Sequence, residues 1–169
     1  MKGDFTRWTF RPEQHYHGVL KQQGRVDLDS DWNEQGAITS HRIETETLDV
    51  IGPAGAPIGD PGFQITVQNG QLMIGKGRAY IDGILCENEA TIPFSQQPDV
   101  PLVGNPLPTR PGYYLAVLEV WLRHITALDD PEIREVALGG PDTCTRAKTV
   151  WQVGLLPLDG SAGQPTCSS

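Results

Sequence analysis

A run rich in glycine and proline divides this sequence into two parts with different patterns. Residues 52–62 have the sequence GPAGAPIGDPG, with four glycines and three prolines in eleven positions. Proline lacks the backbone N–H that helices and central strands need, and glycine is costly in the interior of both. The run therefore excludes a helix or a central strand across it, and it predicts a linker over residues 53–62.

The residues before this run predict one long helix over residues 31–51. Asp31 suits the N-cap and Glu34 suits the third helical position, a pairing known as a capping box. Gly52 stands where a helix-ending glycine belongs, and Pro53 prevents continuation. The apolar residues do not form one clean stripe, so the helix is expected to be contacted on several sides or to pack weakly. These residues are Trp32, Ile38, Ile43, Leu48 and Ile51.

Aromatic residues are concentrated at the start of the chain, where no helical or strand period is visible. Five of the twelve aromatic residues fall within the first 32 positions. On one interpretation they cover the core of their own domain. On the other they belong to an extended arm that buries its rings in a partner, because aromatic side chains are enriched at the centres of interfaces. The partner-binding residues are then Phe5, Trp8, Phe10, Tyr16 and Trp32.

Beyond the linker the sequence predicts antiparallel strands joined by tight turns. Asn69-Gly70 and Asp82-Gly83 are dipeptides that favour two-residue hairpin turns. A further short strand is expected over residues 90–94, at an edge or an end because Pro93 cannot donate a ladder hydrogen bond. The strands of the two hairpins are expected at residues 64–67, 72–74, 78–81 and 84–87.

Residues 113–126 predict the longest strand of the chain. Its first six residues, YYLAVL, are apolar on both faces, so this half is expected to be central in a sheet and covered on both sides. After it, Asp130 as N-cap and Pro131 at the first helical position predict a short helix that ends at Gly139-Gly140. A last strand is expected over residues 148–156.

These patterns together predict an α+β fold. An extended N-terminal arm and one long helix are followed by a mainly antiparallel β-rich domain. The expected organisation is a docking arm and helix over residues 1–52, the linker over 53–62, the β-rich domain over 63–156 and a flexible tail over 157–169.

Charge and cysteine usage exclude several classes of protein. The 169-residue chain has a net charge of −8 without a basic stripe, so we expect neither nucleic acid nor anionic lipid as a partner. No apolar run of about 18 residues occurs, which argues against membrane insertion. The first residues, MKGD, lack the apolar segment of a secretory signal peptide. Cys86, Cys144 and Cys167 form no CxxC pair, which argues against a zinc ribbon and favours a reducing compartment.

The candidate metal and catalytic residues fall short of a site. Asp27, Asp29 and Asp31 alternate as at the start of a calcium loop. Trp32 and Ile38 then stand where such a loop needs glycine and glutamate. The sequence holds no nucleophile motif and no phosphate-binding loop. We therefore expect no enzyme, no cofactor and no metal site.

Several segments resemble an uncharacterised domain family that is encoded with phage tails and phage-derived extracellular contractile injection systems. The resemblance covers most of the chain, from Met1 to about Leu156. The segments that carry it are MKGDFTR (residues 1–7), QQGRVDLDSDWNEQ (22–35), DPEIREVALGGPDT (130–143) and TVWQV (149–153).

The resemblance implies a structural protein of a contractile phage-tail-like particle, as a baseplate, spike or fibre-attachment component. Its implied partners are other tail or baseplate subunits and further copies of itself within a symmetric particle assembled in the bacterial cytoplasm. The alternative is a receptor- or glycan-binding module of the tail, in which Tyr113, Tyr114 or Trp121 would stack on sugar rings. A lytic hydrolase is a third alternative, for which the sequence identifies no convergent carboxylates.

Overall fold

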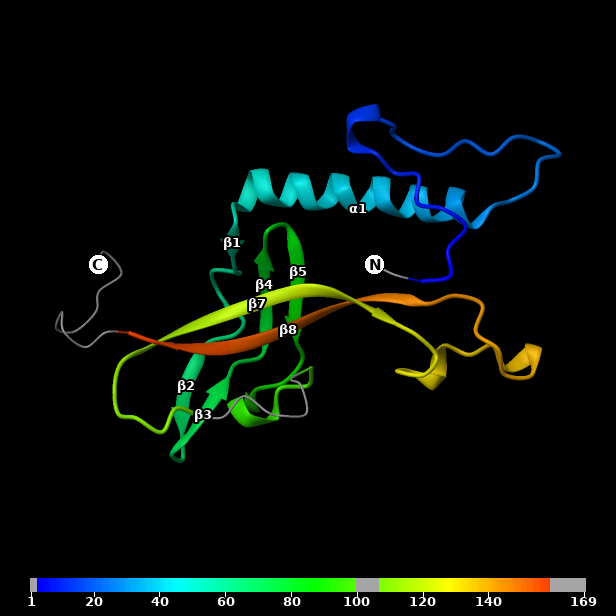
Figure 1. The fold of residues 1–169 in the computed structure, drawn as a ribbon. Helices are drawn as coiled ribbons and strands as arrows, with labels where there is room; N and C mark the ends of the chain where they lie inside the picture. Colours follow the sequence, from blue (N-terminus) through cyan, green and yellow to red (C-terminus); the bar gives the residue numbers. More distant parts are fainter. Residues whose placement is uncertain (1–2, 100–106, 159–169) are drawn as a thin grey trace. The chain divides into compact units, whose positions relative to one another are not determined.

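The computed structural model describes residues 3–99 and 107–158 (Figure 1). It confirms the α+β class, because one long helix is followed by strands that pair antiparallel. The chain divides into two compact units, of which the first comprises Met1–Gly55 and Tyr80–Ile84. The second comprises Ala56–Ala79 and Leu85–Ser169.

The helix of the first unit, α1, covers Asp29–Ile51. It begins two residues earlier than predicted, with Leu28 at the N-cap and no side chain capping it, so the predicted capping box at Asp31 is wrong. Negative charge near a helix N-terminus is favourable without a cap, and Asp29 and Asp31 both lie in the first turn. The predicted end is confirmed, because Gly52 follows α1 and its N–H donates to the Leu48 carbonyl at 2.8 Å.

The first unit also contains the tip of a hairpin that starts in the second unit. Strand β1, Ala54–Gly55, lies in the predicted linker and pairs antiparallel with the Tyr80–Ile81 end of β4, Gly77–Ile81. Strand β5, Ile84–Asn88, completes this sheet in the order β1-β4-β5. The glycine- and proline-rich run therefore supplies a two-residue edge strand, which agrees with its poor suitability for a central one.

Both predicted hairpin turns are confirmed. Asn69 and Gly70 have φ angles of 51° and 76°, and Asp82 and Gly83 have φ angles of 48° and 84°. Two consecutive positive φ angles define the type I′ turn, which matches the twist of the flanking strands. The first turn joins β2, Ile65–Gln68, to β3, Gln71–Ile74, which pairs in turn with the short β6, Ile92–Pro93.

The two longest strands form a ribbon of their own. Strand β7 covers Tyr114–Ile125 and β8 covers Arg146–Pro157, and the two pair antiparallel from Tyr114–Pro157 to Ile125–Arg146. Among the described residues, β8 is the one strand that pairs with β7. The prediction that the first half of β7 is central and covered on both faces is therefore wrong. Leu115 is half exposed, whereas Leu118 packs on the core.

The core of the second unit is built from side chains of the sheets and of one face of the ribbon. The Phe63 and Trp151 rings meet edge to face, with centroids 5.0 Å apart. Leu118 and Val120 extend this core from β7. The buried members are Phe63, Ile74, Ala79, Cys86, Phe94, Trp151 and Val153.

The segment between β7 and β8 contains two 3₁₀ turns, Pro131–Ile133 and Val136–Leu138, in place of the single short helix predicted. The predicted cap is confirmed, because the Asp130 carboxylate accepts a hydrogen bond from the Glu132 N–H at 3.1 Å. The Glu135 carboxylate caps the second turn by accepting a hydrogen bond from the Ala137 N–H at 2.9 Å. The predicted flexible tail lies outside the described residues from residue 159 on.

Candidate protein interface on the arm and helix

The arm, residues 3–28, lies along α1 and is attached to it by polar contacts. The Thr6 hydroxyl and N–H both donate to the Asp29 carboxylate, at 2.6 and 2.9 Å. The Thr9 hydroxyl donates to Glu34. Further along, the Val19 N–H donates to the side-chain oxygen of Gln35 at 2.8 Å. The first two turns of α1 thus hold the arm through acceptors that point away from the helix backbone.

These contacts change the electrostatics of the helix start. Hydrogen bonds from the Thr6 hydroxyl and then the Thr6 N–H lower the pKa of Asp29 from its ordinary value of 3.8. The arm therefore stabilises the ionised form of this carboxylate. Asp29, considered from the sequence as part of a calcium-loop pattern, is thus an anchor for Thr6.

Two of the five predicted partner-binding rings are partly covered within the first unit. The Phe5 ring packs edge to face on Trp8, with centroids 6.1 Å apart. The Phe10 ring packs on His41 of α1, with centroids 5.5 Å apart. Phe5 and Phe10 are half-buried, and the contact of Phe10 with His41 joins the arm to α1.

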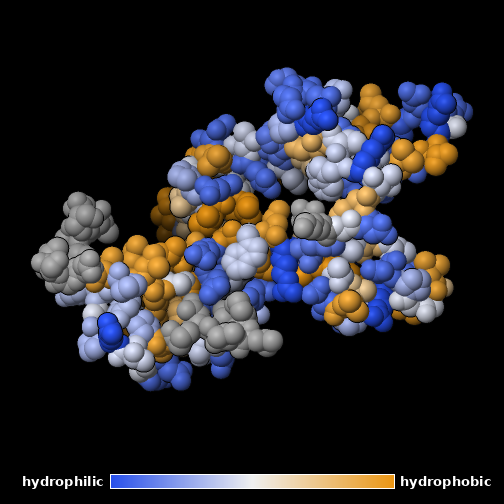
Figure 2. Space-filling model, viewed as in Figure 1, coloured by the Kyte–Doolittle hydropathy of each residue, from blue (hydrophilic) through white to orange (hydrophobic). Residues whose placement is uncertain are grey.

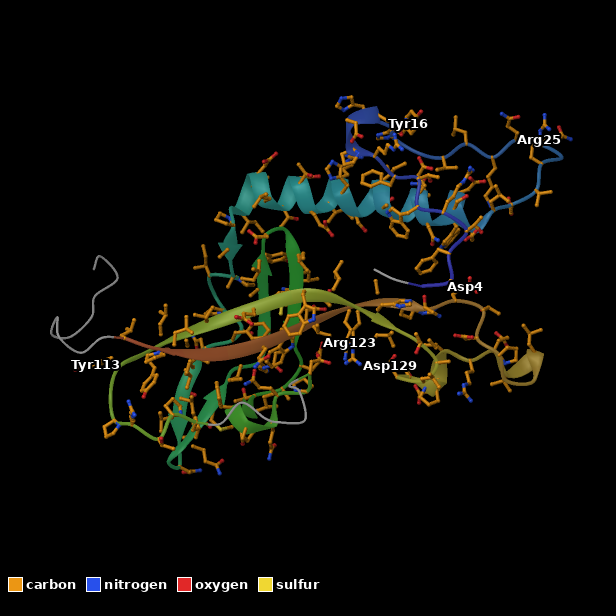
Figure 3. All side chains as sticks on the ribbon, in the orientation of Figure 1. Asp4, Tyr16, Arg25, Tyr113, Arg123 and Asp129 are labelled. Atoms are coloured by element: carbon orange, nitrogen blue, oxygen red, sulfur yellow. The ribbon has the colours of Figure 1, made fainter. Side chains whose placement is uncertain are left out.

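The other three rings remain largely exposed, and the structure does not gather the five into one cluster. Trp8 is 55% exposed, Tyr16 57% and Trp32 75%. Tyr16 lies on the arm (Figure 3) and lines an open groove of about 940 Å³ along α1. Residues of both charge signs and apolar residues share the groove, among them His17, Ile38, His41, Arg42 and Glu46.

One exposed apolar face of α1 was not identified from the sequence. Ile43 and Val50 are mostly exposed and follow Trp32 by 11 and 18 positions. These offsets are close to three and five turns of 3.6 residues, so the three side chains share one face of the helix. The spacing of Trp32, Ile43 and Val50 in the sequence could have identified this face. This signal was obscured because Ile38, Leu48 and Ile51 lie on other faces.

The arm contributes further exposed apolar side chains, Leu20 and Val26, beside its rings. In the space-filling view, apolar side chains reach the surface among polar ones along the first unit (Figure 2). Monomeric proteins rarely expose extended apolar patches, and such patches commonly mark interaction sites. The exposed residues Trp8 and Tyr16 of the arm and Trp32, Ile43 and Val50 of α1 are together called the apolar face below, a name for the exposed apolar side chains of this unit, which do not form a single cluster.

The candidate metal residues make separate contacts. Asp27 forms an ion pair with Lys21 at 3.0 Å, whereas Asp29 is bound to Thr6. Across residues 3–99 and 107–158, no group of three or more His, Cys, Asp or Glu side chains could hold a metal ion. In the same residues, no helix combines the length and apolar character needed to cross a membrane.

Comparisons with other proteins identify a family without an assigned activity. Neither the curated proteins nor the solved structures that were compared gave a match. The model of the family of unknown function DUF6519 matches residues 1–166, and the chain therefore belongs to this family.

Proposed function

We propose that the chain is a structural protein that acts through protein–protein assembly, in a contractile phage-tail-like particle. The observation that carries the assembly role is the apolar face of the first unit, with Trp32 75% exposed. The particle itself is proposed from the resemblance of four sequence segments to a family encoded with phage tails. Within such a particle the chain would be a baseplate, spike or fibre-attachment component.

The energetics favour burial of this face in a partner. An aromatic side chain covers about 150–250 Å², and apolar area contributes about 25 cal/mol per Å² on burial. Covering one half-exposed ring therefore contributes roughly 2–3 kcal/mol. Trp8, Tyr16 and Trp32 each offer such a ring, while Ile43 and Val50 extend the contact along α1.

The attachment of the arm supports the same role. Binding is tighter when the binding segment is already ordered, since less conformational entropy is lost at the moment of association. Hydrogen bonds to Asp29, Glu34 and Gln35 hold the arm on α1 before any partner is present. Phe5 and Phe10 then act as internal supports, and Trp8, Tyr16 and Trp32 as the rings that meet the partner.

The proposed partners are other tail or baseplate subunits and further copies of this chain in a symmetric particle assembled in the bacterial cytoplasm. The proposed role needs no catalysis and no cofactor. It requires only that complementary apolar surface is present on a neighbouring subunit.

The test is incorporation into particles produced in cells. Replacing Trp8 and Trp32 by serine, or deleting residues 1–30, is expected to reduce the amount of the chain in purified particles at least tenfold. The matched control is Ile58→Ser, because Ile58 is fully exposed but lies outside the apolar face. Unchanged incorporation of the chain that lacks residues 1–30 would refute the proposed role of the arm.

The receptor- or glycan-binding alternative rests on one observation, the partial exposure of Tyr113 and Trp121. The two lie eight positions apart, which is about 27 Å along a strand, so one sugar ring cannot stack on both. Tyr114 donates its hydroxyl hydrogen bond to the Arg110 carbonyl at 2.8 Å. Glycan-array binding by the whole chain that is lost in Trp121→Ala would favour this alternative.

A further inference from the structure

The two outer edges of the β7–β8 ribbon differ in the hydrogen bonds that their backbone groups make. The edge of β8 is covered at Val153, whose N–H donates to the Gln97 side-chain oxygen at 2.6 Å and whose carbonyl accepts from the Gln97 amide at 3.1 Å. On the same strand β8, the Lys148 ammonium group forms an ion pair with the Asp99 carboxylate at 3.1 Å. Gln97 is buried, and its side-chain amide makes the two backbone hydrogen bonds that a neighbouring strand would otherwise make with Val153.

The pairing register shows which groups lie on the opposite edge. The backbone of Val153 points away from β7, and Val153 lies opposite Leu118. Residues directly opposite each other in an antiparallel pair either both point inward or both point outward. The backbone N–H and C=O groups of Leu118 therefore point away from β8. Those of Val120 and Leu122 do the same, because backbone direction repeats every two residues along a strand. Among the described residues, no second strand pairs with this edge.

This edge has few of the features by which proteins usually protect an exposed strand. Protected edges are short, or they carry proline, bulges or several charges. Strand β7 has twelve residues and no proline, and its charged residues are Glu119 and Arg123. Trp121 and Leu122 between them are each about two-fifths exposed. Such an edge favours the addition of another strand.

We propose that β7 pairs antiparallel with β7 of a second copy of this chain, with Trp121 at the two-fold axis. In this register Val120 of one copy lies opposite Leu122 of the other, and their outward backbone groups form the ladder. Glu119 lies opposite Arg123 of the other copy, and this pair occurs twice. The product is a four-stranded sheet in the order β8-β7-β7-β8.

Charge complementarity selects this register. Shifting the axis from Trp121 to residue 119 would place two Glu119 carboxylates opposite each other. Shifting it to residue 123 would oppose two guanidinium groups, and like charges directly opposite are destabilising. Arg123 already binds Asp129 at 2.8 Å (Figure 3), but its guanidinium has five N–H donors and retains some for a second carboxylate.

The proposal concerns the second unit and does not depend on the apolar face of the first. The first measurement is the mass of the purified full chain by sedimentation equilibrium at micromolar concentration, where a dimer is expected. A monomer at the highest soluble concentration would overturn the proposal. The edge would then be available to a strand of a different protein.

Cysteine cross-linking tests the register. In a chain with Cys144→Ser and Cys167→Ser, the variant Trp121→Cys is expected to form a disulfide dimer under mild oxidation, because residues opposite at the axis have Cα atoms about 4.5 Å apart. The matched control is Glu119→Cys on the same face. Its two copies would lie about 14 Å apart, too far for a disulfide. Equal cross-linking of both variants would overturn the register.

A charge exchange gives a second readout if Trp121→Cys folds poorly. Glu119→Lys is expected to weaken the dimer about tenfold, because it places a cation opposite Arg123 of the other copy. Adding Arg123→Glu is expected to restore most of the affinity. A dimer that is unaffected by Glu119→Lys would overturn the proposed pairing.

Discussion

The main chain of Gly83 lies directly against the backbone carbonyl of Glu44, so that a Cβ atom on residue 83 would overlap the carbonyl oxygen. Gly83 also has a φ of 84°, a conformation that other residues rarely adopt. The tip of the β4–β5 hairpin thus packs on α1 at a point where only glycine fits.

Gly83→Ala is expected to destabilise the first unit by about 2–4 kcal/mol, because it adds overlap with α1 to the strain of a positive φ. Gly70→Ala is the matched control. Gly70 has a φ of 76° in the same kind of turn but no atom near the position of a Cβ, so its cost is about 1–2 kcal/mol. Denaturant unfolding measures both variants, and equal losses would contradict the role of the Glu44 contact.

Gln97→Ala is expected to destabilise the second unit by about 1–3 kcal/mol. The variant loses the two hydrogen bonds to the Val153 backbone, each worth about 0.5–1.5 kcal/mol. Gln96 is the exposed neighbour in the same turn, so Gln96→Ala is expected to change stability by less than about 0.5 kcal/mol. Chemical denaturation compares the two, and a similar effect at both positions would argue against the strand-like role of the Gln97 amide.

The attachment of the arm is expected to weaken in acid. The pKa of Asp29 is lowered in the folded arm, so the carboxylate contributes its full stabilisation above the ordinary value of 3.8. That contribution is lost as the pH falls through the lowered pKa. Thr6→Val removes the hydroxyl, which is the largest cause of the shift, and should return the pKa of Asp29 toward 3.8.

A carboxyl NMR titration measures this change, and Asp129 provides the internal control. Hydrogen bonds from the N–H and the hydroxyl of Thr126 lower the pKa of Asp129, and these bonds are independent of the arm. Its pKa is expected to be the same with and without Thr6→Val. If Asp29 also kept its pKa in the variant, the Thr6 hydroxyl would not be its partner in solution.

The cysteines are expected to differ in reactivity toward thiol reagents. Burial, followed by the neighbouring Glu87 carboxylate, raises the pKa of the Cys86 thiol to about 12. Cys144 is exposed, and its thiol is accessible to solvent. In a Cys167→Ser chain at pH 8, a disulfide reagent should therefore label Cys144 quickly and Cys86 only after unfolding. Fast labelling of both in the native state would contradict the burial of Cys86.

The turns of this protein could be predicted because their determinants are local. Asn69-Gly70 and Asp82-Gly83 each adopt the positive φ angles that their residue types tolerate best. The end of α1 at Gly52 is local for the same reason. In each case the residues that decide the structure are adjacent in the sequence.

The start of α1 could not be predicted in the same way. Asp31 has the right type for an N-cap, but the helix begins at Asp29, and the Asp29 carboxylate binds Thr6, which is 23 positions away. The covering of Phe10 by His41 is likewise a contact between distant positions. A pattern of residue types does not encode such pairings.

The burial of β7 was mispredicted for a different reason. A run that is apolar on both faces is typical of a central strand, yet it fits equally a ribbon that packs one face on the core. Leu118 packs on that core, while Leu115 remains half exposed opposite Leu156. The sequence pattern indicates which faces of a strand are apolar. It does not indicate whether other residues of the same chain bury both of those faces.

The division of the β4–β5 hairpin between the two units has a topological consequence. The backbone passes from one unit to the other three times, after Gly55, after Ala79 and after Ile84. A single proteolytic cut within residues 56–62 therefore breaks the chain into two fragments but leaves part of the first unit, Tyr80–Ile84, on the C-terminal fragment. A fragment that ends at Gly55 lacks the five residues Tyr80–Ile84 that complete the first unit. Removing the whole first unit would therefore require excising the tip of the β4–β5 hairpin as well.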